Sequence, residues 1–349
     1  MLVLIINMLI LMTYALLLSV STSLNKRTER FALLSLAFVH LLLLHTFFDA
    51  TLFPDLDNYY YYFNNISNPY FKQPEIEMGW KLLNKTLYSI SHNNFILLFT
   101  VSFAIIGFYI TAINRHSRVI WLSVIVFVCL IFYNSLFVLR QHLAMGICAM
   151  TFPYIIERQR MKFLAITLLA VSFHSSALIW LLSYVVFSFK LDKWFFIGLV
   201  SFAVVVFFSM KTMLDQLVLV TTKIMMYTAP IEVGGIGVLK ALGLDLFCIG
   251  LSIYSFGGIR HIKGYNKLFF QLILVSLALT VVSFYGTNFT LFGRLNLYFA
   301  IPNIFLLPNA VANLKSYKQQ YLLFIPAIIV MYTLLLNATA QYGYTLSVD

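Results

Sequence analysis

Long apolar runs follow one another along almost the whole chain, and they constrain the fold more than any other feature. A run of about 20 apolar residues is long enough to cross a bilayer as a helix. Of the 349 residues, 61% are hydrophobic and only 10% are charged, whereas about a quarter are charged in a typical soluble domain. The sequence therefore predicts an all-α polytopic integral membrane protein that has the lipid bilayer as a partner.

The runs predict about twelve transmembrane or half-membrane helices, in one helix bundle that forms a single domain over residues 1–349. The longest connection, residues 54–94, is expected to be an external acidic and aromatic loop. A second external loop at 211–236 is expected to lie along the membrane interface as an amphipathic segment. The expected helices cover residues 2–24, 31–53, 95–113, 119–139, 143–156, 163–173, 175–189, 194–210, 237–256, 268–286, 296–312 and 321–338.

Residues 163–189 allow two interpretations, one long span or two short helices that meet at His174. The positions of the basic residues distinguish the two interpretations, because cytoplasmic loops carry an excess of Lys and Arg. With two helices, fifteen of the 23 basic residues fall on one side of the membrane. Their segments are 25–30, 114–118, 157–162, 190–193, 257–267 and 313–320. The two-helix interpretation is therefore favoured, with both termini outside the cytoplasm. This topology accounts for the net charge of +11, so nucleic acid is not implied as a partner.

Three cysteines, Cys129, Cys148 and Cys248, all lie inside apolar runs. Their positions show no spacing that is typical of a metal site or a disulfide framework. We therefore interpret them as small packed hydrophobic residues, and we expect neither a metal nor a cofactor.

A permanent cation, Arg140, interrupts the apolar sequence in FVLRQHLAMG, with no carboxylate within ten residues on either side. An ionised side chain at the membrane boundary is costly and usually faces a cavity in the protein. The alternative is a snorkelling arginine that reaches the lipid headgroups. Arg294, in FTLFGRLNLYF, repeats the pattern. The planar arginine fork suits phosphate oxygens, so two such residues on one side favour an anionic ligand. Gln141 and His142 extend this donor surface.

A histidine, His174, stands at the expected helix break in SFHSSALIW. Ser175 and Ser176 follow it, so the second helix is expected to start there with exposed N–H groups. His174 is therefore a candidate for binding an oxyanion or exchanging a proton. The alternative is an ordinary packing residue.

Carboxylates and aromatic rings crowd the early loop, in FPDLDNYYYYFNN and then in EIEMGW. Carboxylates, amides and ring faces commonly form a carbohydrate site, because sugar hydroxyls donate to the acids and amides. The alternative is a solvated loop with interfacial tyrosines. Asp55-Leu56-Asp57 imitates the DxD motif of metal-dependent sugar transferases, but three residues are too few to infer a metal.

The order of these motifs resembles the EpsG-type branch of the Wzy polysaccharide polymerases. The similar stretches are DLDNYYYY, EIEMGW, LRQHLAMGI, LLAVSFHSSALI and GRLNLYFAIPNIFLLP, over residues 50 to 310. The resemblance implies a metal-independent glycosyltransferase in the bacterial inner membrane, with its active site facing the periplasm or exterior. Such an enzyme transfers a growing glycan from undecaprenyl pyrophosphate to the non-reducing end sugar of another lipid-linked repeat unit. A chain-length regulator protein is a further partner that the resemblance allows.

By motif match, the resemblance implies that Arg140 and Arg294 bind the pyrophosphate, with His174 nearby. Fixed cations would stabilise the negative charge that builds on this leaving group. The attacking sugar hydroxyl needs a base within hydrogen-bond reach, and Asp57 and His174 are both candidates. A direct displacement at the anomeric carbon would invert its configuration. The expected substrate-binding residues are Gln141, His142, Glu77, Tyr59, Tyr61 and Tyr298.

Two other functions remain open. A flippase or transporter of lipid-linked oligosaccharides would place its cations deep in a central cavity, and it would not need the acidic outer loop. An O-antigen ligase of related architecture usually carries its large outer loop late in the chain, whereas here the longest loop is early.

Overall fold

The computed structural model describes residues 10, 13–14, 26–47, 54–71, 76–136, 138–220, 235–284 and 289–314. Within these ranges every regular element is helical, which confirms that the fold is all-α. The chain divides into two compact units, Met1–Leu178 and Ile179–Asp349, and each is described by itself. That the chain forms one domain stays a prediction.

Four helical segments of the described chain are long and apolar enough to cross a membrane, and shorter apolar helices accompany them. The four are Arg27–Thr46, Asn94–His116, Gly264–Val282 and Gly293–Ala312. A multi-pass membrane protein fits these segments, while its compartment and orientation stay predictions. The span expected at 321–338 lies outside the described residues, as do all but three residues of the one expected at 2–24.

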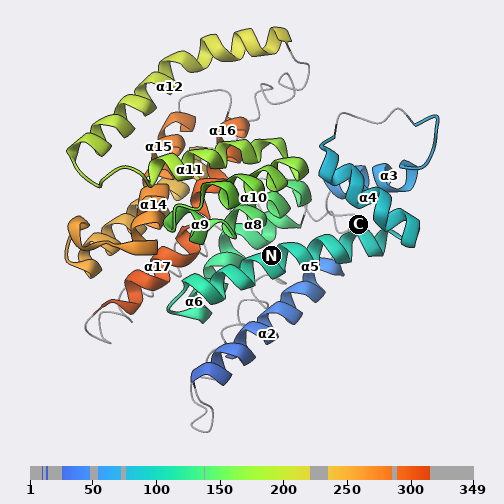
Figure 1. The fold of residues 1–349 in the computed structure, drawn as a ribbon, viewed down its shortest axis with the longest axis horizontal. Helices are drawn as coiled ribbons and strands as arrows, with labels where there is room; N and C mark the ends of the chain where they lie inside the picture. The colour runs from blue at the N-terminus through green and yellow to red at the C-terminus, as the bar shows by residue number, and fades with distance from the viewer. Residues whose placement is uncertain are drawn as a thin grey trace. The chain divides into compact units, whose positions relative to one another are not determined.

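The first unit is built around α8 (Leu139–Ala149), which packs against both α5 (Asn94–His116) and α10 (Arg160–Phe173). Figure 1 shows α2 (Lys26–Thr46) beside α5. The side chains of α8 from Gln141 to Ala149 are all buried. The other elements of this unit are α3 (Pro54–Asn65), α4 (Met78–Ile90), α6 (Ile120–Phe127), a π-helical segment (Val128–Phe132), α7 (Tyr133–Ser135) and α9 (Phe152–Ile156).

The early connection is not the loop that we expected, because α3 and α4 occupy most of residues 54–94. Pro54 suits the first position of a helix, where no N–H is needed, and Asp55 and Asp57 face the positive end of the helix dipole. α4 buries one face, formed by Trp80, Asn84 and Leu87. Because the segment is polar overall, its buried residues at helical spacing do not stand out in the sequence.

Two prolines divide helices that were expected to be continuous. The expected helix 143–156 breaks into α8 and α9, because Pro153 has no N–H to donate to the carbonyl of residue 149. The expected helix 296–312 likewise separates at Pro302 into α16 (Phe289–Ala300) and α17 (Asn303–Ala312).

Residues 163–189 are interrupted at His174, as the basic residues predict, but the helix expected at 175–189 is a 3-10 helix followed by a short α-helix that ends at Val186. α10 ends at Phe173, and His174 is extended, with φ −154° and ψ 119°. A 3-10 helix over Ser175–Trp180 then leads into α11 (Leu181–Val186).

Arg30 joins two of the segments that we expected on the same side of the membrane. Its Nε atom donates to the side chain of Asn114 at 2.8 Å. Its Nη2 atom donates to the backbone carbonyl of Asn114, and to that of Ser117 at 3.4 Å. Asn114 lies in the last turn of α5 and Ser117 follows its last residue, where backbone carbonyls lack the usual helical donor. Residues 26–30 and 114–118 therefore lie together, while the side that they face stays a prediction.

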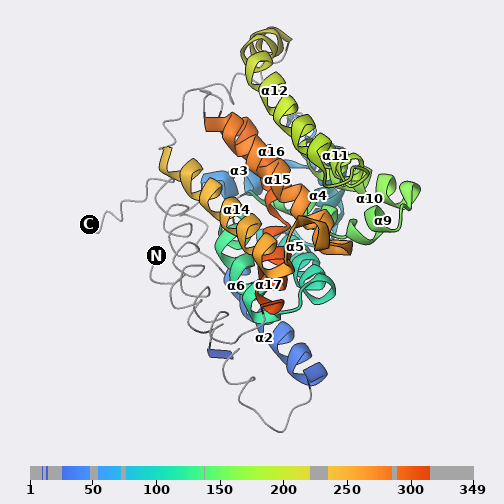
Figure 2. The same cartoon turned by 90° about the vertical axis from the view of Figure 1, so that its left-hand side faces the viewer.

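The second unit contains α12 (Lys193–Val220), α14 (Gly235–Phe256) and α15 (Gly264–Phe284), followed by α16 and α17. α12 continues through residues 211–220, where we expected a separate interfacial segment, and 221–234 lie outside the described residues. α14, α15 and α17 pack against one another (Figure 2).

Asp245 joins three helices of the second unit from a buried position on α14. Its Oδ2 atom accepts a hydrogen bond from Ser276 on α15 at 2.7 Å, and its Oδ1 atom accepts one from Asn303 on α17 at 2.9 Å. Buried polar groups need such partners, because an unmade hydrogen bond leaves the full cost of desolvation. Asp245 therefore fixes how α15 and α17 pack on α14.

Asp245→Leu is expected to destabilise the protein by about 2–3 kcal/mol, because it leaves two buried donors without an acceptor. Asp245→Asn keeps an acceptor oxygen and should cost less. Thermal unfolding of the purified variants in one detergent measures both. A leucine variant as stable as the wild type would contradict this role.

Candidate functional site

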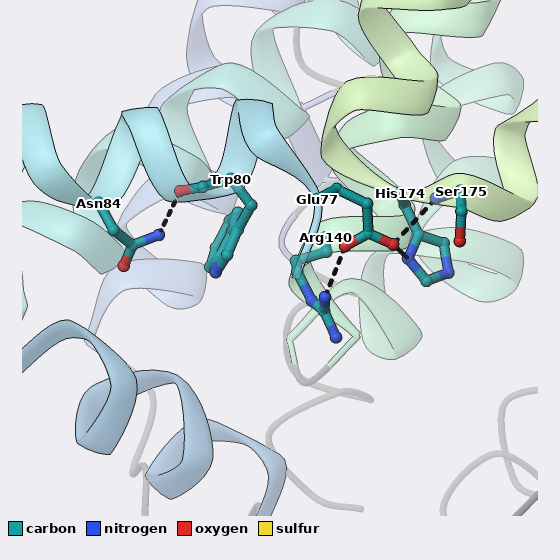
Figure 3. Close-up of polar contacts among 6 residues, drawn as sticks. All are labelled: Glu77, Trp80, Asn84, Arg140, His174 and Ser175. Atoms are coloured by element: carbon teal, nitrogen blue, oxygen red, sulfur yellow. Dashed lines mark hydrogen bonds and ion pairs between the residues drawn. The ribbon is translucent and has the colours of Figure 1, made fainter. Parts of the chain in front are cut away.

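Glu77, Arg140 and His174 meet where three helices of the first unit begin or end (Figure 3). Glu77 precedes α4, Arg140 lies in the first turn of α8, and His174 follows the last residue of α10. α10 packs against both α4 and α8, which holds these helix ends together. We call these three residues, with the backbone amide of Ser175, the Glu77 cluster.

The carboxylate of Glu77 is the centre of the cluster. Arg140 Nη1 donates to Glu77 Oε2 at 2.8 Å. The backbone N–H of Ser175 donates to the other oxygen, Oε1, at 3.0 Å. His174 Nδ1 lies 3.6 Å from the same Oε1 atom. Each carboxylate oxygen thus accepts one hydrogen bond, one from a guanidinium and the other from a backbone N–H, and the His174 imidazole lies beside the second oxygen.

Gly79 allows the start of α4 to approach the end of α10 closely. A Cβ atom on Gly79 would lie 2.7 Å from the carbonyl oxygen of Ser172 and closer still to its hydroxyl oxygen. Real Cβ atoms essentially never come within 3.0 Å of another heavy atom. A glycine at this position therefore lets Glu77 reach His174 and Ser175.

The cluster is largely withdrawn from solvent, with 16% of the Glu77 side chain and 26% of the Arg140 side chain exposed. Burial alone would raise the pKa of Glu77. The neighbouring His174, the Ser175 amide and the charge of Arg140 outweigh burial and hold the pKa of Glu77 well below its usual range. Glu77 is therefore ionised at neutral pH.

An aromatic ring, that of Tyr59 on α3, packs near the Arg140 guanidinium. The guanidinium carbon lies 5.9 Å from the centroid of this ring, which is a cation–π distance. The Tyr59 ring in turn packs edge-on against Trp80, with centroids 5.4 Å apart. Trp80 is fully buried, and its carbonyl accepts a hydrogen bond from Asn84 at 2.8 Å (Figure 3). These contacts connect Arg140 to the buried face of α4.

Gln141 and His142 follow Arg140 on α8, and both side chains are fully buried. His142 Nδ1 lies 3.0 Å from the carbonyl oxygen of Val138. Because a carbonyl oxygen only accepts, this nitrogen carries the hydrogen. The part of Gln141 and His142 in substrate binding stays a prediction.

Asp57 and Tyr61 lie on the exposed surface of α3, whereas Tyr59 on the same helix reaches Arg140. Tyr61 has 62% of its surface exposed, and its ring meets that of Phe71 edge-on with centroids 5.6 Å apart. Roles for Asp57 as a base and for Tyr61 in acceptor binding stay predictions.

Arg294 and Tyr298 both belong to α16 of the second unit. Arg294 is partly exposed, and Tyr298 is fully buried. On the same helix, Asn296 donates to Thr280 on α15 at 2.8 Å. Because Arg140 lies in the first unit, the predicted meeting of the two guanidinium groups stays a prediction.

The three cysteines are buried, which agrees with their interpretation as packed hydrophobic residues. Within the part of the chain that the structure describes, no group of three or more His, Cys, Asp or Glu side chains could hold a metal ion.

The sequence analysis assigns Glu77 to acceptor binding and does not pair it with Arg140. The two residues are 63 positions apart, and a single sequence contains no signal that joins them. One available signal is the cost of an unpaired cation near the membrane. This cost implies that Arg140 pairs with a carboxylate that is distant in the sequence, but it does not identify that carboxylate. The Ser175 donor is a backbone group, so its side chain gives no indication of it.

Comparison with protein families yields a match to the EpsG family model over residues 31–346. No curated protein and no solved structure matches the chain. The matched range includes Glu77, Arg140, His174 and Arg294. The chain therefore belongs to the EpsG family.

Proposed function

We propose that this protein is a polysaccharide polymerase that transfers a growing glycan from undecaprenyl pyrophosphate to the non-reducing end sugar of another lipid-linked repeat unit. Membership of the EpsG family supports a role in polysaccharide biosynthesis. The observation that carries the finer proposal is the Glu77 cluster, in which a guanidinium, an imidazole and a backbone N–H surround an anion. The reaction takes place on the outer face of the bacterial inner membrane.

The donor groups of the cluster suit the diphosphate of the glycosyl donor. Arginine keeps its charge at any physiological pH, and its fork matches two oxygens of a phosphate. His174 and the Ser175 amide add donors from a second direction. Arg140 and His174 therefore bind the diphosphate. The family resemblance assigns the same role to Arg294.

Cleavage of the glycosyl–diphosphate bond moves an electron pair onto the leaving diphosphate. Fixed cations and N–H dipoles aimed at this charge lower the barrier, because they need no reorganisation during the reaction. Such groups also act more strongly in a partly dry site than in water. The cluster provides this stabilisation without a metal, and direct displacement inverts the anomeric carbon.

The acceptor sugar binds on the α3 side of Arg140. Tyr59 already contacts the guanidinium, and Tyr61 and Asp57 are exposed on the same helix. Ring faces can stack on the apolar faces of a sugar, and carboxylates accept from its hydroxyls. We also keep Gln141, His142 and Tyr298 as proposed substrate-binding residues, on the grounds given by the sequence.

The position of the cluster favours a polymerase over a flippase. Its three side chains sit at helix ends, whereas a flippase needs its polar groups along a path through the bundle. An O-antigen ligase remains the second candidate, because it breaks the same kind of glycosyl–diphosphate bond.

Reconstitution tests the proposed function. We expect purified protein in vesicles to convert lipid-linked repeat units into a ladder of products that differ by one repeat unit each. The control omits the protein, and a second reaction offers a lipid core acceptor in excess. Products no longer than one repeat unit would reject the polymerase, and transfer only to the lipid core would identify a ligase.

A further inference from the structure

The carboxylate of Glu77 occupies the cluster in the way that a bound oxyanion would. Each of its oxygens accepts from a separate element, Arg140 of α8 on one side and the Ser175 amide on the other (Figure 3). His174 lies next to the second oxygen. Binding of two oxygens of a phosphate group also requires hydrogen-bond donors that converge on both oxygens.

This arrangement creates a competition if the same donors bind the diphosphate of the substrate. Arg140 Nη1 and the Ser175 N–H already bond to Glu77, so these bonds must be given up when a diphosphate arrives. A diphosphate carries more negative charge than one carboxylate, and therefore interacts more strongly with the same cation. Occupation by Glu77 nevertheless lowers the apparent affinity for the substrate.

We infer that Glu77 is a displaceable anion that occupies the diphosphate site, and that it becomes the base for the acceptor hydroxyl once the donor substrate has displaced it. This inference rests on the proposed function. It assigns to Glu77 a catalytic role for which the sequence favours Asp57 or His174.

The backbone around Glu77 suits a side chain that changes partners. Glu77 precedes α4 with an extended backbone, φ −61° and ψ 144°, and its side chain does not cap the helix. Rotation about its side-chain bonds thus breaks no hydrogen bond of α4. The Glu77 side chain is partly exposed, so it is not enclosed on every side by protein.

Displacement also changes the basicity of the carboxylate. In the cluster, the hydrogen bonds and the charge of Arg140 hold the pKa of Glu77 below its usual range, which makes it a weak base. A diphosphate that takes over these donors removes that stabilisation and adds a negative neighbour. Both changes raise the pKa of Glu77. The base is therefore strengthened only when the donor substrate is bound.

The step balances without a further reactant. The displaced Glu77 carboxylate accepts the proton of the acceptor hydroxyl, and the hydroxyl oxygen forms a bond to the anomeric carbon of the donor. The bond from that carbon to the diphosphate oxygen breaks, and its electron pair leaves with the diphosphate. Arg140 and His174 hold the released charge.

Glu77→Gln separates the two roles, because glutamine has nearly the same shape but neither charge nor basicity. We expect this variant to bind inorganic pyrophosphate about tenfold more tightly than the wild type. This factor corresponds to a site that Glu77 leaves free in about one wild-type molecule in ten. We also expect its rate of chain extension to fall by at least about a hundredfold, the usual effect of losing a base. Calorimetric titration and the vesicle assay measure the two quantities.

Two further variants complete the experiment. Glu157→Gln removes an exposed carboxylate that accepts from Gln159, and should change neither quantity. Glu77→Asp keeps the charge but shortens the side chain that bridges Arg140 and Ser175. It should bind pyrophosphate more tightly than the wild type and retain more activity than Glu77→Gln, so it tests the inference even if glutamine impairs folding.

The outcomes distinguish the inference from the proposed function. Weaker pyrophosphate binding by both Glu77 variants would show that the carboxylate supports the site and does not compete for it. Near-normal chain extension by Glu77→Gln would reject the base. A wild-type protein that neither binds pyrophosphate nor extends the glycan would instead reject the polymerase itself.

Discussion

Arg140→Ala is expected to slow chain extension by about a hundredfold, the loss that follows removal of one oxyanion donor from a preorganised site. The guanidinium already points into the cluster and lies against the ring of Tyr59, so little reorganisation separates its resting position from the one that binds a leaving group. The rate at which lipid-linked repeat units become longer products, in vesicles with equal amounts of folded protein, measures the effect.

Arg140→Lys and Arg160→Ala make this prediction specific. Lysine keeps the charge but cannot offer a planar fork, so it should recover only part of the rate. Arg160 is exposed at the first position of α10, the opposite end of that helix from His174, and its alanine variant should behave like the wild type. Normal product length from Arg140→Ala would remove Arg140 from the mechanism.

Combining Arg140→Ala with Glu77→Gln shows whether the two side chains act as one unit. If Arg140 and Glu77 act on the same step, the double variant should lose less than the product of the two single losses. Independent losses would mean that the ion pair in the free protein has no bearing on the reaction.

Hydropathy and proline positions account for much of the fold. Residues 95–113 and 268–284 of the expected spans are helical in the structure, because a chain in lipid must satisfy its backbone hydrogen bonds within each segment. The basic residues around 157–162 and 190–193 also predict the break at His174 correctly. Hydropathy does not predict the helices within residues 54–94. α3 and α4 are amphipathic, and their polar residues keep them below a hydropathy criterion for membrane spans.

The candidate site is predictable in its residues but not in its contacts. Arg140 and His174 stand out because a charge and a helix break interrupt apolar runs. Their shared partner Glu77 comes from a segment that looks like a loop, and the backbone amide of Ser175 has no sequence signature. Pairing over such separations depends on how α4, α8 and α10 pack, which local periodicity does not encode.

Gly79→Ala is expected to impair chain extension by as much as about a hundredfold, since a misplacement of about 1 Å at a reacting group has effects of that size. The new methyl group would lie 2.7 Å from the carbonyl oxygen of Ser172 and 2.9 Å from its carbonyl carbon. Backbone atoms cannot rotate away as a side-chain tip can, so α4 must move relative to α10. Glu77, two residues before Gly79, moves with α4.

Two other glycines provide a graded comparison within the same unit. Gly107→Ala would place its methyl group 3.8 Å from Phe38, an ordinary contact, and should stabilise α5 by about 0.5–1 kcal/mol because alanine favours helix. Gly146→Ala on α8 would place its methyl group 3.1 Å from the Cβ atom of Phe108 and 3.3 Å from its ring, so Phe108 must give way slightly. The expected order of activity is therefore Gly107→Ala, then Gly146→Ala, then Gly79→Ala.

Removal of the Ser172 hydroxyl decides what the methyl group at position 79 disturbs. In the double variant Gly79→Ala with Ser172→Ala, the closest side-chain atom is gone but the carbonyl oxygen at 2.7 Å remains. Because this backbone contact forces the helices apart, the double variant should recover little activity. Full recovery would mean that the hydroxyl alone caused the clash, and that the approach of α4 to α10 does not determine where Glu77 meets Arg140.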